Sequence, residues 1–199
     1  MVIIKKIYRK IIKSINRKLN KNHTFTILCD SCVAGVIYRE LNEVFRTPTI
    51  NVGIHGKSFI QFLSNIEFYL SQDIIEVPNS GYEHPVGKLY DIYLYFVHSQ
   101  SFDEAKESWM KRKQRINLSN LYLVMTENDG CDFSVMKDFD ALPLKNKVVF
   151  THKPYPEIKS AYYIHGFEKY NEIGNIIDYS NSIGKRYYDE FNWVKWLNN

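Results

Sequence analysis

The sequence predicts an α/β fold, a three-layer α/β/α sandwich with a mostly parallel or mixed sheet, preceded by a basic amphipathic helix. Short apolar segments of strand length alternate along the chain with longer segments whose apolar residues recur at helical spacing. The chain has 199 residues, 45% of them hydrophobic and 24% charged, which suits a single domain with one sizeable core. We therefore expect a helix within residues 1–22 and one α/β domain over residues 23–199.

Residues 2–20 are expected to form one amphipathic helix, because large aliphatic residues recur at every fourth position. The repeating residues are Ile3, Ile7, Ile11, Ile15 and Leu19. Residues 1–22 carry eight basic and no acidic residues, whereas the rest of the chain has 18 basic and 22 acidic residues. The helix could pack its apolar stripe on the domain, or lie on an anionic membrane surface. We predict membrane association, and no nucleic-acid partner, because no nucleic-acid-binding motif follows.

The strands of the domain are expected where apolar, β-branched and aromatic residues are bounded by polar ones. These strands span residues 25–28, 49–53, 74–77, 91–98, 121–126 and 147–152. Helices are expected where apolar residues recur at helical spacing. Ser101 and Glu104 also form a capping box, which marks the start of one of these helices. These helices span residues 33–39, 57–70, 102–116, 133–142 and 186–197.

The turn from Cys29 to Cys32 joins the first strand to the first helix of the domain. Asp30 or Ser31 is expected to cap this helix by accepting a hydrogen bond from a free backbone N–H. The thiol of Cys32 would then lie at the positive end of the helix dipole, where a thiolate or a bound anion is stabilised. A purely structural turn and a C-x-x-C redox pair are the alternatives. The redox pair is disfavoured because Asp-Ser between the cysteines is unusual for such a motif.

Ligand sites in open α/β sheets lie outside the carboxyl ends of the strands. The expected strand ends carry His55, His98, Asp129 and Lys153, together with the turn that contains Cys32. Arg112 and Arg115, on the helix over residues 102–116, could add an anion clamp. The sequence thus predicts a pocket with a nucleophile, candidate bases and cations. It predicts no metal site, because the histidines are scattered and no H-x-x-x-H or paired C-x-x-C motif is present.

Cysteine count and hydropathy predict the compartment. Three cysteines, an odd number, argue against a disulfide framework and for a reducing compartment. No apolar run approaches the ~20 residues that a membrane-spanning helix needs, and lysines interrupt the apolar residues near the N-terminus as they would not in a signal peptide. We expect a cytoplasmic protein, peripheral at the inner face of the membrane.

Nine segments, in this order and spacing, resemble the bacterial family called domain of unknown function 1919, over roughly residues 24–165. They are residues 27–38, 47–51, 59–70, 85–92, 102–112, 115–121, 129–131, 139–143 and 145–151. The family's opening motif is Ser-Asn-Asn-Cys followed by a Gly-Gly pair. This chain keeps Cys32 but has Asp30 and Ser31 in place of the asparagines and Ala-Gly in place of the glycines. The family's Asp-Arg-Asp-Gly-Cys loop appears here as Glu-Asn-Asp-Gly-Cys, with Asp129 kept.

The resemblance implies a role in surface-polysaccharide assembly, because members of this family are often labelled exopolysaccharide or capsule biosynthesis proteins. We expect a transferase acting on a sugar or a sugar-linked lipid, with Cys32 as nucleophile or anion anchor and His98 or His55 as general base. Asp129 would orient the base or act as the acid. Substrate contacts are expected from Asp30, Ser31, Arg112, Arg115, Asn117 and Lys153. No motif identifies a cofactor.

The alternative is a non-catalytic module of the same pathway that binds a glycan or a protein. The 15 tyrosines support this alternative, because amphipathic aromatic rings suit sugar and protein surfaces.

Overall fold

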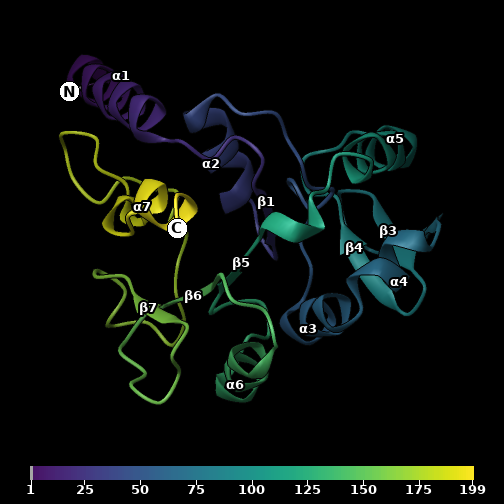
Figure 1. Ribbon diagram of the computed structural model, residues 1–199. Coiled ribbons are helices and arrows are strands. Elements are labelled where there is room, and N and C mark those ends of the chain that lie inside the picture. The colour runs from purple at the N-terminus through teal and green to yellow at the C-terminus, as the bar shows by residue number, and fades with distance from the viewer. Residues whose placement is uncertain (1) are drawn as a thin grey trace.

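The computed structural model describes residues 2–199 and contains two sheets of different construction (Figure 1). The larger sheet is parallel throughout, with the order β1-β5-β6-β7. Its strands are β1 (Thr26–Cys29), β5 (Leu121–Thr126), β6 (Lys147–Thr151) and β7 (Ala161–Tyr163). The smaller sheet is an antiparallel meander of β2 (Ile74–Glu76), β3 (Val86–Leu89) and β4 (Ile92–Tyr95). The predicted α/β class is confirmed.

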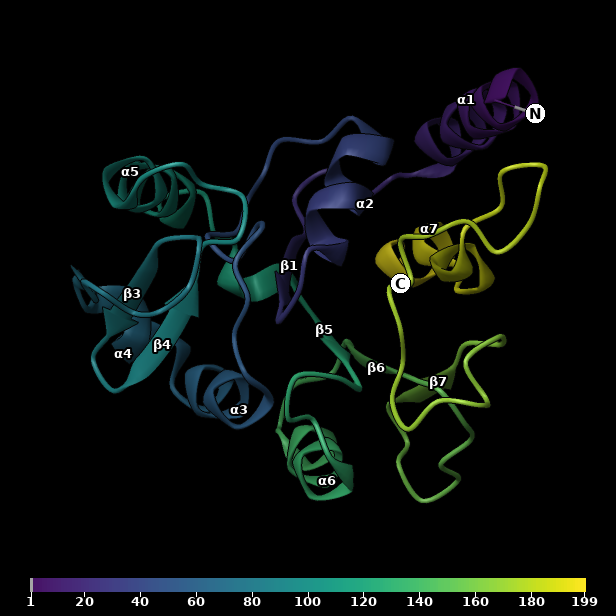
Figure 2. The same ribbon diagram turned by 180° about the vertical axis from the view of Figure 1, so that it is seen from behind.

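Helices cover both faces of the parallel sheet, which makes three layers (Figures 1 and 2). Alternate side chains of each strand enter opposite cores, as the two-residue period of a strand requires. Ile27, Val124 and Phe150 pack with α2 (Val33–Leu41) and α7 (Trp193–Leu197). Leu28, Met125 and Val149 pack on the other face. That second core also contains residues of α3 (Gly56–Ser64), α5 (Phe102–Lys113) and α6 (Phe133–Ala141).

Several expected elements are shorter or divided. The helix expected over residues 57–70 is two helices, α3 and α4 (Ile66–Ser71), because the backbone leaves the helical region at Asn65. The helix expected over residues 186–197 is a 3₁₀ turn, η2 (Tyr187–Glu190), followed by α7. A second 3₁₀ turn, η1 (Leu118–Asn120), precedes β5.

The strand expected over residues 91–98 is reduced to β4 and belongs to the small antiparallel sheet. Tyr90 takes a φ of 58°, which lets the chain reverse directly between β3 and β4. A two-residue connection of this kind makes an antiparallel hairpin, whereas a parallel neighbour would need a long crossover. This strand therefore lies outside the parallel sheet, at whose carboxyl edge its end was expected.

The strand expected over residues 49–53 is also wrong, because residues 48–51 form a turn. Only Gly53 pairs, in an isolated bridge to Tyr95: each residue donates its N–H to the other's carbonyl, at 2.8 and 3.0 Å. The next N–H, that of Ile54, donates to the carbonyl of Asp30 at 3.1 Å. These three backbone hydrogen bonds connect the small sheet to the carboxyl end of β1.

Asp30 also connects β1 to β5 through its side chain. The buried carboxylate accepts hydrogen bonds from the N–H of Thr126 at 2.9 Å and from its hydroxyl at 3.2 and 3.3 Å. Burial disfavours the charged form and raises the pKa of Asp30 to about 7, although the bonds from Thr126 oppose that shift.

The N-terminal helix α1 (Val2–Leu19) lies at the edge of the domain and contacts α2 (Figure 1). The residues turned toward the domain include Lys5, Tyr8, Arg9, Ile12 and Asn16, spaced as one face of a helix. The apolar stripe of the same helix is exposed to solvent. The interpretation that this stripe covers the α/β core is therefore contradicted.

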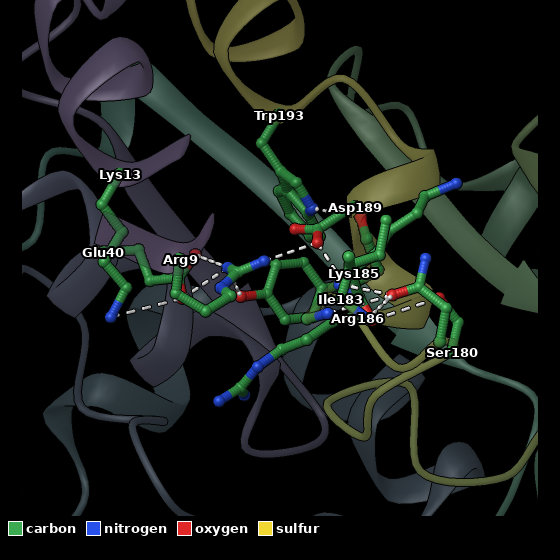
Figure 3. Close-up of polar contacts among 12 residues, drawn as sticks. Arg9, Lys13, Glu40, Ser180, Ile183, Lys185, Arg186, Asp189 and Trp193 are labelled. Atoms are coloured by element: carbon green, nitrogen blue, oxygen red, sulfur yellow. Dashed lines mark hydrogen bonds and ion pairs between the residues drawn. The ribbon is translucent and has the colours of Figure 1, made fainter. Parts of the chain in front are cut away.

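Arg9 is the residue that attaches α1 to the domain (Figure 3). Its side chain is buried, and its guanidinium donates to both carboxylate oxygens of Glu40 at 2.6 and 2.5 Å and to the carboxylate of Asp189 at 2.5 Å. It also donates to the hydroxyl of Tyr188 at 2.7 Å. Burial alone would lower the pKa of Arg9, but these anionic neighbours outweigh it and raise the pKa.

Replacing Arg9 should destabilise the fold, because Arg9→Met would leave the carboxylate of Asp189 without its cation and that of Glu40 with only the partly exposed Lys13, whose ammonium lies 3.6 Å away. Breaking a buried ion pair in this way typically costs about 3–5 kcal/mol. We expect a loss of that size in the free energy of unfolding, measured by urea denaturation. The control is Lys10→Met on the exposed side of the same helix, which should change stability by less than about 0.5 kcal/mol. Equal stabilities of the two variants would contradict the role given to Arg9.

The raised pKa of Asp30 predicts how stability depends on pH. The folded state favours the protonated carboxyl, so Asp30 lowers stability as pH rises from its unfolded value of 3.8 to its folded value of about 7. Asp30→Asn should therefore be more stable than the parent above neutrality, by at most about 4 kcal/mol, and similar to it near pH 4. Urea titrations of both proteins across this range measure the difference. A constant difference between pH 4 and 8 would contradict the assignment.

Candidate functional site

The N-terminus of α2 carries Cys32 as its N-cap residue, with φ −77° and ψ −4°. The side chain of Cys32 makes no capping hydrogen bond, and the expectation that Asp30 or Ser31 caps the helix is wrong. The carboxylate of Asp30 is engaged with Thr126 instead, and the hydroxyl of Ser31 lies 3.4 Å from the sulfur of Cys29. The half-buried thiol of Cys32 is thus the side chain found at this helix end.

His98 lies beside this thiol, with its Nε2 atom 3.3 Å from the sulfur of Cys32. His98 is exposed and belongs to the segment that follows β4, so it comes from the small sheet, whereas Cys32 comes from the parallel one. Either tautomer of the ring fits a hydrogen bond here: Nε2 can accept from a thiol or donate to a thiolate. A nucleophile and a base within hydrogen-bonding reach are the core of a thiol-dependent active site.

The surroundings of Cys32 favour the protonated thiol over the thiolate. Burial raises the pKa of the thiol, and Asp30 adds to this effect, while Arg39 lowers it. Its position at the helix N-terminus is therefore not enough to deprotonate the Cys32 thiol. His98 is the neighbouring group that could take its proton.

The other two cysteines, Cys29 and Cys131, are buried, whereas Cys32 is partly exposed. Burial and the adjacent Asp30 raise the pKa of Cys29 to about 12, and burial also raises the pKa of Cys131. All three thiols are free, so the structure contains no bond between Cys29 and Cys32.

Arg112 lines a small cavity that it shares with His98. The cavity has a volume of about 140 Å³ and is lined in part by Asn51, Ser99, Glu104 and Ser108. The Arg112 guanidinium donates to the carbonyl of Ile50 at 3.2 Å, and burial together with the nearby Arg115 lowers its pKa. The guanidinium of Arg115 instead approaches the carbonyl of Phe45, at 3.5 Å, and does not line this cavity.

A second groove lies on the other side of the segment that carries His98. It has a volume of about 300 Å³ and is lined by Gly53, Ile54, His55, Tyr82, His84, Tyr95, Val97 and Asp129. The rings of His55, Tyr82 and His84 lie around that of Tyr95, with centroids 4.9 to 6.2 Å from it. Such an aromatic wall can stack against an apolar face of a ligand.

His55 and Asp129 meet in this groove, but through the main chain of Asp129. The Nδ1 atom of His55 lies 3.2 Å from the carbonyl oxygen of Asp129, and the N–H of Gly56 donates to the same oxygen at 3.4 Å. A Cβ on Gly56 would lie 3.1 Å from the Cα of Cys131, so glycine permits this close approach. The Asp129 carboxylate is free to face solvent, because that residue is exposed.

Two candidate residues lie elsewhere. The N–H of Asn117 donates to the hydroxyl of Thr26 at 2.9 Å, at the start of β1 and thus at the opposite end of that strand from Cys32. Lys153 lies beyond the end of β6, with its ammonium 5.3 Å from the ring centre of Tyr155. The structure therefore places Cys32 beside His98, His98 and Arg112 in the lining of one cavity, and His55 and Asp129 in the lining of a second groove.

A buried polar cluster at the ends of β5 and β6 was not among the predicted site residues. The carboxylate of Glu127 accepts from the N–H of His152 at 2.8 Å and lies 2.6 Å from its Nδ1 atom. The Tyr155 hydroxyl donates to the other oxygen of Glu127. Glu127 follows one predicted strand and His152 ends another, but their pairing depends on the register between the strands, which the sequence does not reveal.

The carboxyl edge of the parallel sheet carries groups suited to nucleophilic chemistry. A thiol and an imidazole lie within hydrogen-bonding reach of each other, and the imidazole shares one cavity with a guanidinium. Within residues 2–199, no three His, Cys, Asp or Glu side chains are grouped so as to hold a metal ion. No helix in the same range is long and apolar enough to span a bilayer.

Comparison with known proteins assigns the chain to a family. Residues 3–198 match the family described as Domain of unknown function (DUF1919). An uncharacterized protein of Haemophilus influenzae (strain ATCC 51907 / DSM 11121 / KW20 / Rd) is 44% identical over 186 residues, which is 94% of this chain and 89% of that protein. The chain thus belongs to the DUF1919 family.

Proposed function

We propose that this chain is a group-transfer enzyme in which Cys32 is the nucleophile and His98 its general base. The observation that carries the proposal is the 3.3 Å separation between the Cys32 sulfur and Nε2 of His98, at the N-terminus of α2. Burial keeps the thiol protonated, so a base is needed to generate the reactive thiolate.

The proposed reaction has two displacement steps. The sulfur of Cys32 attacks an electrophilic carbon of the donor while His98 takes the thiol proton. The bond from that carbon to the leaving group then breaks, and His98 returns the proton to the leaving group. A sugar hydroxyl next attacks the carbon bound to sulfur, with His98 accepting the hydroxyl proton. The carbon–sulfur bond breaks and the Cys32 thiol is restored.

The cavity that His98 lines and the groove around Tyr95 suit different parts of a sugar substrate. The groove around Tyr95 offers aromatic faces to a sugar ring and the polar edges of His55 and Asp129 to its hydroxyls. The cavity that contains Arg112 offers a cation to a phosphate or carboxylate. We propose a sugar or a sugar-linked lipid as the substrate, within surface-polysaccharide biosynthesis, on the resemblance described under Sequence analysis.

A second candidate is a glycan-binding module without catalysis. The observations that favour it are the aromatic groove around Tyr95, on which a sugar ring can stack, and the raised pKa of Cys32, because a protonated thiol need not react. The reactivity of the thiol separates the two functions.

Cys32→Ser and His98→Asn should each abolish polymer production in cells that depend on this protein, with normal protein levels. The serine hydroxyl keeps the shape of the site but is a far weaker nucleophile, and asparagine removes the base. The matched control is His165→Asn, an exposed histidine paired with Glu190 away from Cys32, which should leave production unchanged. Normal polymer from a stable Cys32→Ser protein would exclude Cys32 as nucleophile.

Alkylation of the folded protein by iodoacetamide tests the dyad directly. Cys32 should be the residue labelled, because Cys29 and Cys131 are buried with raised pKa values. His98→Asn should slow labelling at least about tenfold at neutral pH, since loss of the base lowers the thiolate fraction. Mass spectrometry of the labelled peptides measures both effects. Labelling of Cys32 at the same rate in both proteins would favour the binding module.

A further inference from the structure

We propose that the exposed apolar stripe of α1 is a docking surface for an anionic membrane, on which the helix lies parallel to the bilayer. This stripe consists of Ile3, Ile4, Ile7, Ile11, Ile15 and Leu19. The inference is independent of the reaction proposed for Cys32.

The stripe is apolar and open to solvent along the whole helix. Its side chains are between 46% and 72% exposed, and the 18 residues of α1 extend over about 27 Å. A continuous exposed surface of this kind marks an interaction site in a soluble domain, whereas single exposed apolar residues need no explanation.

The domain holds α1 so that the stripe points outward. Arg9, on the opposite face, is fixed by Glu40, Asp189 and Tyr188 (Figure 3). Arg17 donates to the carbonyl of Glu40 at 2.8 Å. Near the start of the helix, the Lys5 ammonium lies 4.3 Å from the ring centre of Tyr179. The helix is therefore attached by its polar side, and the apolar side is left for a partner.

The charges beside the stripe identify the partner as anionic. Lys6, Lys10 and Lys18 are exposed, and each lies within three or four positions of a stripe isoleucine, so they neighbour the stripe on the helix surface. No acidic residue occurs among residues 2–22. Lysine stems can extend along an apolar surface while the ammonium reaches the lipid headgroups. Apolar insertion combined with attraction to anionic lipids is the binding mode of interfacial amphipathic helices.

The same charges disfavour the other occupants. A second copy of the stripe would bring two sets of lysines together with no acid on either helix to neutralise them. A nucleic acid would meet the lysines but gains nothing from the isoleucines, because its contacts to such proteins are mainly to phosphates. An anionic lipid surface matches both components.

The test is co-sedimentation of the full chain with phosphatidylcholine vesicles that contain phosphatidylglycerol. We expect binding that high salt reverses, and weak binding to pure phosphatidylcholine vesicles. Ile7→Asn with Ile11→Asn should lower the partition coefficient at least about tenfold, because two inserted side chains are lost. Lys6→Gln with Lys10→Gln should lower binding to the anionic vesicles by a similar factor.

Ile75→Asn is the matched control, because Ile75 is 69% exposed on β2 in the small sheet, away from α1. It should bind as the parent does. Thermal melts confirm that each variant is folded; if the asparagine pair is not, Ile3→Asn replaces it with the same expected direction.

Three results would overturn the proposal. The first is failure of the parent to bind anionic vesicles at low salt. The second is parental binding by the folded asparagine variant. The third is a dimer, detected by light scattering, that the asparagine variant abolishes, since the stripe would then be occupied by a second copy.

Discussion

The site depends on the backbone of Asp30 and Ile54, where the two sheets of the protein meet. Asp30 accepts a hydrogen bond from the N–H of Ile54 with its carbonyl, and its carboxylate accepts from β5. Because Gly53 pairs with Tyr95 at the same point, the end of β4 is held against the end of β1. His98 follows β4 by three residues, so this junction fixes its distance to Cys32. Burying the carboxylate of Asp30 is unfavourable, and it accompanies the junction that sets the separation of Cys32 and His98.

The elements that the sequence predicted well are those whose signal is local. The apolar strands β5 and β6 and the capped helix α5 form close to their expected bounds. The strand predicted over residues 49–53 does not form, because a side chain takes the place of its backbone in hydrogen bonding. The hydroxyl of Thr49 accepts from the N–H of Cys29 at 3.1 Å, and this N–H is the donor that a neighbouring strand would have used. Threonine favours strands by propensity, but its hydroxyl can compete with backbone pairing. Propensity alone does not distinguish these outcomes.

The site was predicted in part from an incorrect topology. His98 was placed near Cys32 on the assumption that its strand joins the parallel sheet, whereas it arrives from the antiparallel one. Polar residues at strand ends gather because several chain segments converge there. His98 therefore still lies near Cys32, although its strand belongs to the other sheet. The thiol was expected to be activated by the helix end, but burial dominates its pKa. Burial is a property of the packed chain that no local motif encodes. For the same reason the Glu127–His152 pair could not be identified in advance.

The orientation of α1 is the clearest case in which a local sequence pattern does not predict which residues are buried. Periodicity predicts the helix, and the hydrophobic effect would then bury the isoleucines, each worth about 1.5–3 kcal/mol when fully buried. The structure instead buries Arg9, whose desolvation is unfavourable and must be offset by carboxylates 31 and 180 residues away. The hydrophobic term alone would therefore favour the opposite face inward. Under the membrane docking proposed for α1, the stripe has a surface of its own to contact, and the ion pair of Arg9 sets the direction in which the helix faces.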